Sequence, residues 1–258
     1  MNKASDAFNV PQRAIDWAKS RVVEAEKTSL RYLKDYAFTI LVQDDIEAKE
    51  HVSKIRLTKP PPMEIEGLFR NALVDLKHSF DQSLYAAAQA MGCLRFDKNY
   101  PWADTRTGFM TIVEKRQLQK DSRLPEALVD ELRRQEPYIT ESNPTSDGNL
   151  VREIAKMAND KHTIGFTASA SIASMSVSNV VFQGNRLGLP GKWDPVKKEM
   201  EITRIAFGDT LSYDVPAFAA AIFFERDGLM GQIPVVLALN KFAEKAQVVL
   251  DGLKRSCS

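Results

Sequence analysis

Cysteine and long apolar runs are both scarce in this sequence. Cys93 and Cys257 are the only cysteines, and neither belongs to a CxxC pair or a Cys/His spacing typical of zinc sites. No stretch approaches the roughly 18 apolar residues that cross a bilayer, and the first residues lack the apolar core of a secretory signal. We therefore expect a cytoplasmic protein with no disulfide framework and no membrane partner.

The short motifs that identify common enzyme classes are also missing. The sequence contains no GxxxxGK[ST], GxGxxG, GxSxG or HExxH, and no cluster of metal-ligating residue types. These absences argue against four protein classes: P-loop nucleotide-binding proteins, dinucleotide-binding proteins, hydrolases with a nucleophile elbow, and zinc proteases. We expect no cofactor and no metal, and the sequence leaves open whether the protein is an enzyme at all.

Charge of either sign is not in excess. The 258 residues carry 35 Lys+Arg against 34 Asp+Glu, a net charge of +1, so no global field attracts nucleic acid or a membrane surface. Hydrophobic residues make up 44% and charged residues 27%, which is typical of a globular protein with a well-formed core. Partners must therefore be sought at a local site.

Apolar residues recur with the helical period in four segments before residue 162. The segments are 10–36, 63–91, 124–135 and 147–162. In the second, Ile65, Phe69, Leu76 and Phe80 fall on one stripe at about 100° per residue, which predicts a long amphipathic helix. Residues 93–122 show no clear period, and we interpret them as a long loop with short elements.

Strand-like patterns occur early and again late in the chain. Segments 37–45 and 51–59 predict a hairpin, and segments 163–182, 199–213 and 217–228 predict an antiparallel sheet that the hairpin is able to join. A final helical stripe covers 234–255. The predicted fold class is α+β, a single unit over residues 1–258. Its helical part spans about 10–162 and its β-rich part about 163–258, closed by the last helix.

Three polar residues lie at the edge of the long helical stripe. Lys77 and Asp81 stand four residues apart, between the buried face and solvent, and Arg70 falls at the same border. In that position they are able to face a groove and bind a polar group. The plainer interpretation is an ion pair between neighbouring helical turns, which supports the helix by a few tenths of a kcal/mol.

A second polar cluster ends the segment 147–162. Asn159, Asp160, Lys161 and His162 stand in a row where the helical pattern gives way to a strand-like one. A helix C-terminus favours a protonated histidine through its partial negative charge. The same residue types are also common helix-end residues, so capping alone explains them equally well.

Both clusters belong to a wider resemblance. The segments NALVDLKHSFDQSLYA, RRQEPY and MANDKHTIGF resemble a group of uncharacterised bacterial proteins, which in turn resembles the HEPN helical proteins. The residues that carry the resemblance are Ala72, Leu73, Leu76, Lys77 in place of Arg, Asp81, Pro137, Tyr138, Asp160, Lys161 and His162. Val74–Asp75 and Gln82 replace histidine-containing positions of the group, and Thr163 replaces an Arg. Many HEPN proteins are RNases with an Arg four to six residues before the active-site His, where this chain has Lys156.

Two functional hypotheses follow. The first is a non-catalytic ligand-binding or interaction module, with a polar groove between helices 65–91 and 147–162 that holds a small ligand or a protein partner. Its binding residues are Arg70, Lys77, Asp81, Asn159 and Asp160. The alternative implied by the resemblance is a metal-independent RNase, with His162 as general acid/base and Lys161 stabilising the phosphorane charge. We favour the first, because a lysine lacks the fork with which arginine grips a phosphate, and because RNA binding usually needs a basic surface.

Overall fold

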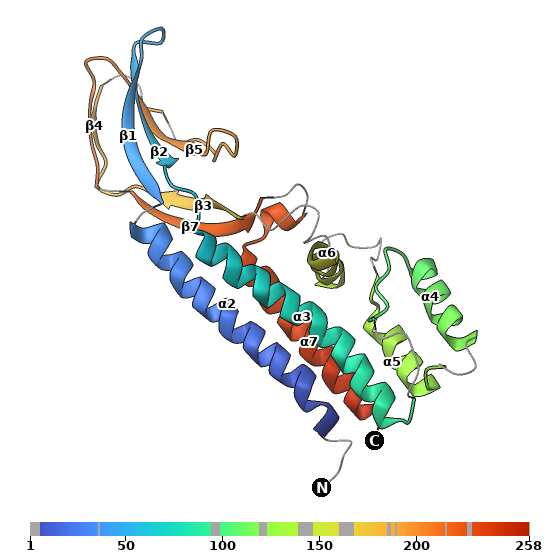
Figure 1. The fold of residues 1–258 in the computed structure, drawn as a ribbon. Coiled ribbons are helices and arrows are strands. Elements are labelled where there is room, and N and C mark those ends of the chain that lie inside the picture. Colours follow the sequence, from blue (N-terminus) through green and yellow to red (C-terminus); the bar gives the residue numbers. More distant parts are fainter. Residues whose placement is uncertain are drawn as a thin grey trace. The chain divides into compact units, whose positions relative to one another are not determined.

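The computed structural model describes residues 6–35, 37–93, 99–118, 123–138, 147–159, 168–184, 187–188, 190–214, 216–225 and 229–257. The chain folds into two compact units (Figure 1). The helical unit comprises Met1–Ala25, Glu66–Phe166 and Arg226–Ser258, and the β unit comprises Glu26–Ile65 and Thr167–Glu225. The fold is α+β, as predicted. The helical and β-rich parts alternate along the chain, because the early hairpin joins the later strands and the last helix joins the earlier helices.

The predicted helices form, and one more is present. Their bounds are α2 Asn9–Asp35, α3 Met63–Ala90, α4 Arg106–Leu118, α5 Glu126–Gln135, α6 Asp147–Asn159 and α7 Val235–Arg255, with a short 3-10 turn, η2, at Leu229–Gln232. Helices α2, α3 and α7 run side by side (Figure 1). The side-chain amides of Gln12 and Gln247 bond across α2 and α7 at 3.0 Å. No helix among the described residues is both long enough and apolar enough to cross a membrane.

Helix α3 provides the centre of the helical core. Ile65, Phe69, Leu76 and Phe80 are fully buried, which confirms the predicted stripe, whereas His78 is exposed on the opposite side. The Phe80 ring stacks on Phe242 of α7, with ring centroids 5.1 Å apart. The rings of Tyr100 and Trp102 meet Phe80 at 5.2 and 4.9 Å. This aromatic cluster joins α3, α7 and the segment that follows α3.

Helix α4 lies in the region interpreted from sequence as a loop. It buries Phe109, Val113 and Arg116, which are spaced at i, i+4 and i+7 as on one helical face. The third of these is charged, and its guanidinium donates to the Asn99 carbonyl at 2.8 Å. A stripe of two apolar residues and an arginine is too short to be recognised by hydrophobic period alone, which explains why the helix was not predicted.

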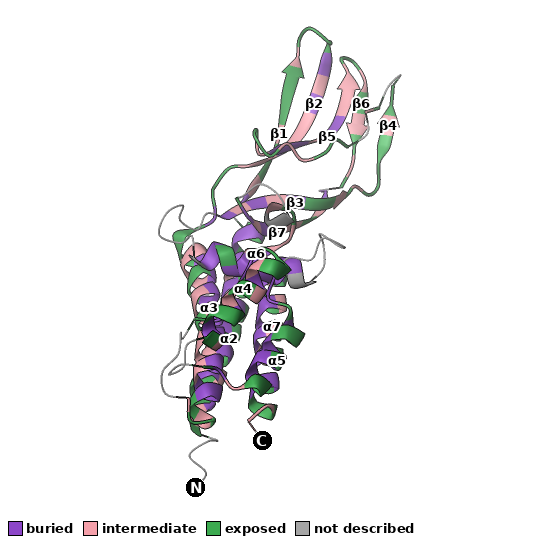
Figure 2. Cartoon of the chain, turned by 90° about the vertical axis from the view of Figure 1, so that its right-hand side faces the viewer, coloured by how far each residue is buried: buried purple, intermediate pink, exposed green. Residues whose placement is uncertain are grey.

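The β unit contains the strands β1 Phe38–Asp45, β2 Glu50–Leu57, β3 Ala168–Ser176, β4 Val181–Gln183, β5 Glu199–Ala206, β6 Thr210–Ser212 and β7 Ala217–Phe224. Within the described part of the chain, these strands pair antiparallel, as predicted, and form three sheets with the orders β1-β2-β5, β3-β7 and β4-β6. The early hairpin therefore meets a strand about 150 residues later in the chain, with Ile55 opposite Met200. Strand β1 is largely exposed (Figure 2).

A small apolar core lies within the β unit. Ile55, Ile172, Met200 and Ile202 are buried together. Half-buried apolar residues pack around them: Phe38, Met175, Val177, Trp193, Phe218 and Ala220. This core brings β2 and β5 together with β3.

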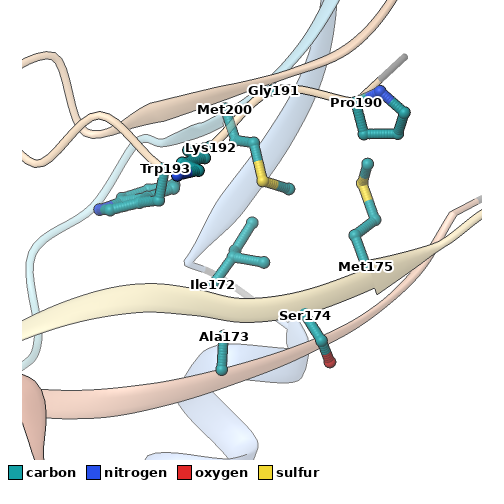
Figure 3. Close-up of a pocket in the computed structure, with 9 residues that line it drawn as sticks. All are labelled: Ile172, Ala173, Ser174, Met175, Pro190, Gly191, Lys192, Trp193 and Met200. Atoms are coloured by element: carbon teal, nitrogen blue, oxygen red, sulfur yellow. The ribbon is translucent and has the colours of Figure 1, made fainter.

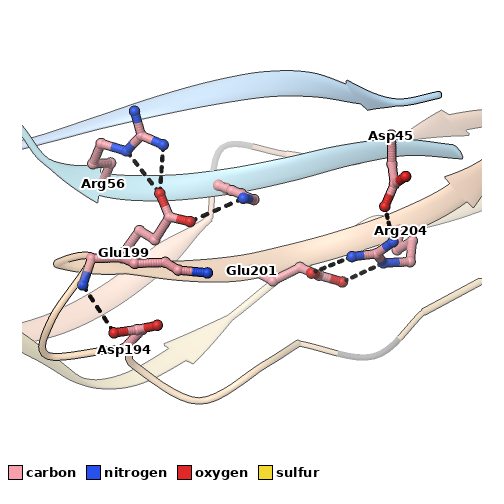
Figure 4. A network of polar contacts seen from close by, with 8 residues as sticks. Asp45, Arg56, Asp194, Glu199, Glu201 and Arg204 are labelled. Atoms are coloured by element: carbon pink, nitrogen blue, oxygen red, sulfur yellow. Dashed lines mark hydrogen bonds and ion pairs between the residues drawn. The ribbon is translucent and has the colours of Figure 1, made fainter. Parts of the chain in front are cut away.

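Opposite charges pair across the sheet β1-β2-β5 (Figure 4). The Glu199 carboxylate accepts hydrogen bonds from Lys54 at 2.9 Å and from Arg56 at 2.5 and 2.8 Å. These two partners hold the pKa of Glu199 below its usual value, the Lys54 hydrogen bond being the larger cause. On the same sheet, Arg204 donates to Asp45, Glu50 and Glu201 at 2.9 to 3.1 Å.

The lowered pKa of Glu199 predicts a loss of stability in acid. A carboxylate whose pKa is lowered in the folded state stabilises the fold fully when the pH is above its pKa in the unfolded chain, which is 4.5 for Glu. This stabilisation is lost as the pH falls through the pKa of the folded state. We expect Glu199→Gln to melt at a lower temperature than the native chain at pH 7, because Lys54 and Arg56 lose their partner. The difference in melting temperature should narrow as the pH falls below about 4.5. If the difference in melting temperature between Glu199→Gln and the native chain stays constant from pH 7 to pH 3, this prediction is contradicted.

Candidate functional site

Lys77 and Asp81 form the ion pair that the plainer interpretation predicts. The Lys77 Nζ lies 2.7 Å from Asp81 Oδ2, and the two side chains are only 16% and 18% exposed. The other carboxylate oxygen of Asp81 accepts a hydrogen bond from the backbone N–H of Tyr100 at 2.7 Å. Both oxygens of Asp81 are therefore engaged within the protein. Arg70 lies two turns earlier on α3 and is exposed.

The segment that begins at Tyr100 is held from two further directions. The Ala103 N–H donates to the Pro137 carbonyl at 3.0 Å. Arg152 of α6 donates from Nε to the Ala103 carbonyl at 2.9 Å and from a terminal nitrogen to Asp104 at 2.8 Å. Asp81 and Pro137 are two of the residues that carry the resemblance noted in the sequence. Both hold the short segment from Tyr100 to Ala103 through its backbone N–H groups. Sequence reasoning missed Arg152, because an arginine on the buried face of a helix carries no distinguishing pattern.

The second polar cluster lies outside what the structure describes. Asp160, Lys161 and His162 are beyond the described end of α6, and the side chain of Asn159 is not described either. Lys156, at the position of the expected arginine, is exposed on α6. The convergence of the two clusters on one groove therefore stays a prediction.

The β unit contains a pocket of about 350 Å³ (Figure 3). The residues that line it are Ile172, Ala173, Ser174, Met175, Pro190, Gly191, Lys192, Trp193 and Met200. We call it the β-unit pocket. It is continuous with the small core of this unit, because Ile172 and Met200 belong to both. Most of its lining side chains are aliphatic, thioether or indole, whereas its accessible surface is slightly more polar than apolar.

A β-bulge in β3 shapes one wall of the pocket. Ile172 is opposite Ala220 and Ser174 is opposite Ala219, so that Ala173 is an extra residue on its strand. Without the bulge, residues three apart would point to opposite faces of the sheet. With it, Ile172 and Met175 both point toward the pocket, while Ala173 and Ser174 point away (Figure 3).

A glycine-containing segment of residues 187–188 and 190–194 lies opposite β3, and its residues 190–193 line the pocket. It runs along β5, with backbone hydrogen bonds from Gly188 to Arg204 at 2.7 Å and from Gly191 to Glu201 at 2.8 Å. A Cβ on Gly188 would lie 2.9 Å from the Cβ of Arg204, and one on Gly191 would lie 3.3 Å from the Cβ of Glu201. Glycine therefore permits the close approach. The sequence showed only a Gly/Asn/Pro-rich separator here.

The same segment places Trp193 beside the pocket. The Trp193 ring meets Phe38 of β1 edge to face, with centroids 5.9 Å apart and planes at 82°. Phe38 meets Phe218 of β7 in the same way, at 5.4 Å and 75°. Edge-to-face contacts of this kind stabilise a fixed ring position. The indole therefore forms an anchored part of the wall.

The residues that line the pocket include few ionisable side chains. Lys192 is the one charged residue among its lining residues, and none of them is a histidine, cysteine or carboxylate. Within the described residues, no group of three or more His, Cys, Asp or Glu side chains is arranged to hold a metal ion. Comparisons with known proteins found no matching protein-family model, no matching curated protein and no matching solved structure.

Proposed function

We propose that the protein is a non-catalytic ligand-binding protein whose β-unit pocket holds a small apolar group. The observation that carries this proposal is the pocket itself, about 350 Å³ between β3, β5 and the glycine-containing segment. Small-molecule sites are typically concave, roughly 300 to 1,000 Å³ in volume, and lined mainly by apolar side chains with a few polar groups. The pocket therefore suits a small ligand or one apolar arm of a larger one.

The lining residues support binding rather than a simple packing defect. Met175 and Trp193 are half-buried, and Pro190 is exposed, so the pocket opens to solvent on this side. Thioether side chains such as Met175 and Met200 adapt their shape to different apolar ligands. A bulge beside the pocket is also a common device for directing side chains toward a site.

The absence of a catalytic constellation among the lining residues supports the non-catalytic part of the proposal. A serine nucleophile requires a neighbouring base, and the one serine of the pocket, Ser174, points away from it (Figure 3). The polar groove between α3 and α6 and the RNase alternative remain predictions. The proposal does not rest on them, because residues 160–162 lie outside the described chain and Asp81 is already engaged.

A methyl-labelled NMR titration tests the proposal. The chain has 8 methionines, so ¹³C-methyl signals of Met175 and Met200 can be compared with those of methionines outside the pocket. We expect 1-octanol to shift the signals of Met175 and Met200 in a saturable manner. We expect Met175→Phe, which places a ring in the pocket, to weaken 1-octanol binding about tenfold, or ~1.4 kcal/mol.

The neighbouring residue offers a matched control. Ser174→Phe introduces the same ring on the same strand, but on the side that points away from the pocket (Figure 3). It should leave the affinity for 1-octanol close to that of the native chain. An absence of saturable shifts, or equal affinities for the native chain and Met175→Phe, would overturn the proposed function.

A further inference from the structure

We infer that the ligand of the β-unit pocket is a small amphipathic carboxylate, with its apolar chain in the pocket and its carboxylate beside Lys192. This inference rests on the proposed function and deepens it by naming the class of ligand. Two observations support it: Lys192 is among the lining residues, and the charged residues of the neighbouring sheet β1-β2-β5 form ion pairs with one another.

The backbone of Lys192 is held at the pocket by its neighbours. On one side, the Gly191 N–H donates to the Glu201 carbonyl at 2.8 Å, and on the other the Trp193 ring packs against Phe38. The side chain of Lys192 is solvent-exposed. An ammonium on a flexible stem therefore sits at the border between the apolar side chains of the pocket and water, which is where the head group of an amphiphile would lie.

The charge of Lys192 is not neutralised by the ion pairs of the sheet. Lys54 and Arg56 are bound to Glu199, and Arg204 is bound to Glu201 and two further carboxylates. Among the described residues, no ion pair joins Lys192 to a carboxylate. The acidic groups of β5 are therefore occupied. The lysine at the pocket is left to attract an anion and to disfavour a cation.

The volume of the pocket limits the length of the apolar chain. At about 30 Å³ for each non-hydrogen atom, the volume of a water molecule in the liquid, the pocket holds roughly a dozen such atoms. A straight medium-length chain fits this space, whereas a long fatty acyl chain exceeds it. The buried side chains of Ile172 and Met200 would surround the chain, and the exposed rim at Pro190 and Lys192 would leave the head group in water.

Three probes that share one chain and differ in charge test this inference. Octanoate, 1-octanol and octylamine are titrated as monomers, below the concentration at which they form micelles, and the methyl signals of Met175 and Met200 report binding. We expect octanoate to bind about two- to five-fold more tightly than 1-octanol, the gain typical of an exposed ion pair, and octylamine to bind most weakly. The preference for octanoate should shrink as salt is added.

Lys192→Gln should abolish the preference for octanoate over 1-octanol, because it removes the ammonium that attracts the carboxylate. Lys197→Gln is the matched control, because Lys197 is an exposed lysine of the same region that does not line the pocket. The control should keep the preference. If the native chain binds 1-octanol as tightly as octanoate, or if Lys192→Gln retains the preference, the inference is overturned and the proposed function stands. If none of the three probes binds, the proposed function itself is overturned.

Discussion

Replacing Phe80 with alanine is expected to lower the free energy of unfolding by about 3 to 5 kcal/mol, because it removes a large buried ring and leaves a cavity. Phe80 is fully buried and stacks on Phe242 of α7. Its ring also meets those of Tyr100 and Trp102, and aromatic pairs contribute about 0.5 to 1.5 kcal/mol beyond their buried area. Urea denaturation followed by circular dichroism measures the change.

His78→Ala is the matched control for Phe80→Ala. His78 is on the same helix two residues earlier and is exposed. A substitution at such a surface position typically changes stability by no more than about 0.5 kcal/mol. Similar denaturation midpoints for the two variants would show that the buried face of α3 does not centre on Phe80.

Gly252→Ala is expected to destabilise the protein by about 1 to 3 kcal/mol, the usual cost of overpacking a core. A Cβ on Gly252 of α7 would lie 2.7 Å from the Cδ of Glu131 on α5, and closer still to its Oε1. The Glu131 side chain cannot move aside cheaply, since it is 1% exposed. Its oxygens also accept hydrogen bonds from Gln135 at 2.6 Å and from Arg134 at 2.5 Å.

A glycine-to-alanine substitution at Gly67 should have the opposite effect on stability. Gly67 lies inside α3, and a Cβ there meets no atom within 4 Å. Gly67→Ala should therefore stabilise the protein by about 0.5 to 1 kcal/mol, because alanine favours the helix and restricts the unfolded chain. In a Glu131→Ala background, the cost of Gly252→Ala should fall. Equal effects of Gly252→Ala and Gly67→Ala in thermal melts would show that α5 does not approach α7 at this point.

Of the contacts made by Lys77 and Asp81, the sequence predicted the one within a single helix and not the one between separate segments. The spacing of Lys77 and Asp81 was enough to predict an ion pair at the edge of the buried face, and the two side chains form one at 2.7 Å. The spacing did not show that Asp81 also holds the backbone of Tyr100, because that contact joins residues 19 positions apart through the folded chain. An interaction within one helix follows from the helical period, whereas one between separate segments depends on how they pack.

The β-unit pocket was not predictable from the sequence for the same reason. Alternating apolar residues predicted that 163–182 and 199–213 contain strands, and they contain β3 and β5. The pattern did not indicate the bulge at Ala173, which turns Met175 toward the pocket. It did not indicate either that the glycine-containing segment runs along β5.

The sequence by itself determined the secondary structure of most of this chain. Hydrophobic period places α2, α3, α5, α6 and α7, and alternation places the hairpin β1–β2 and the later strands, because each pattern is a property of neighbouring residues. Only the tertiary structure decided that β2 pairs with β5, that α7 packs on Phe80, and that Glu131 and Arg152 are buried. Hydrogen bonds and packing between distant segments depend on register and shape in three dimensions, which no local pattern of residue types encodes.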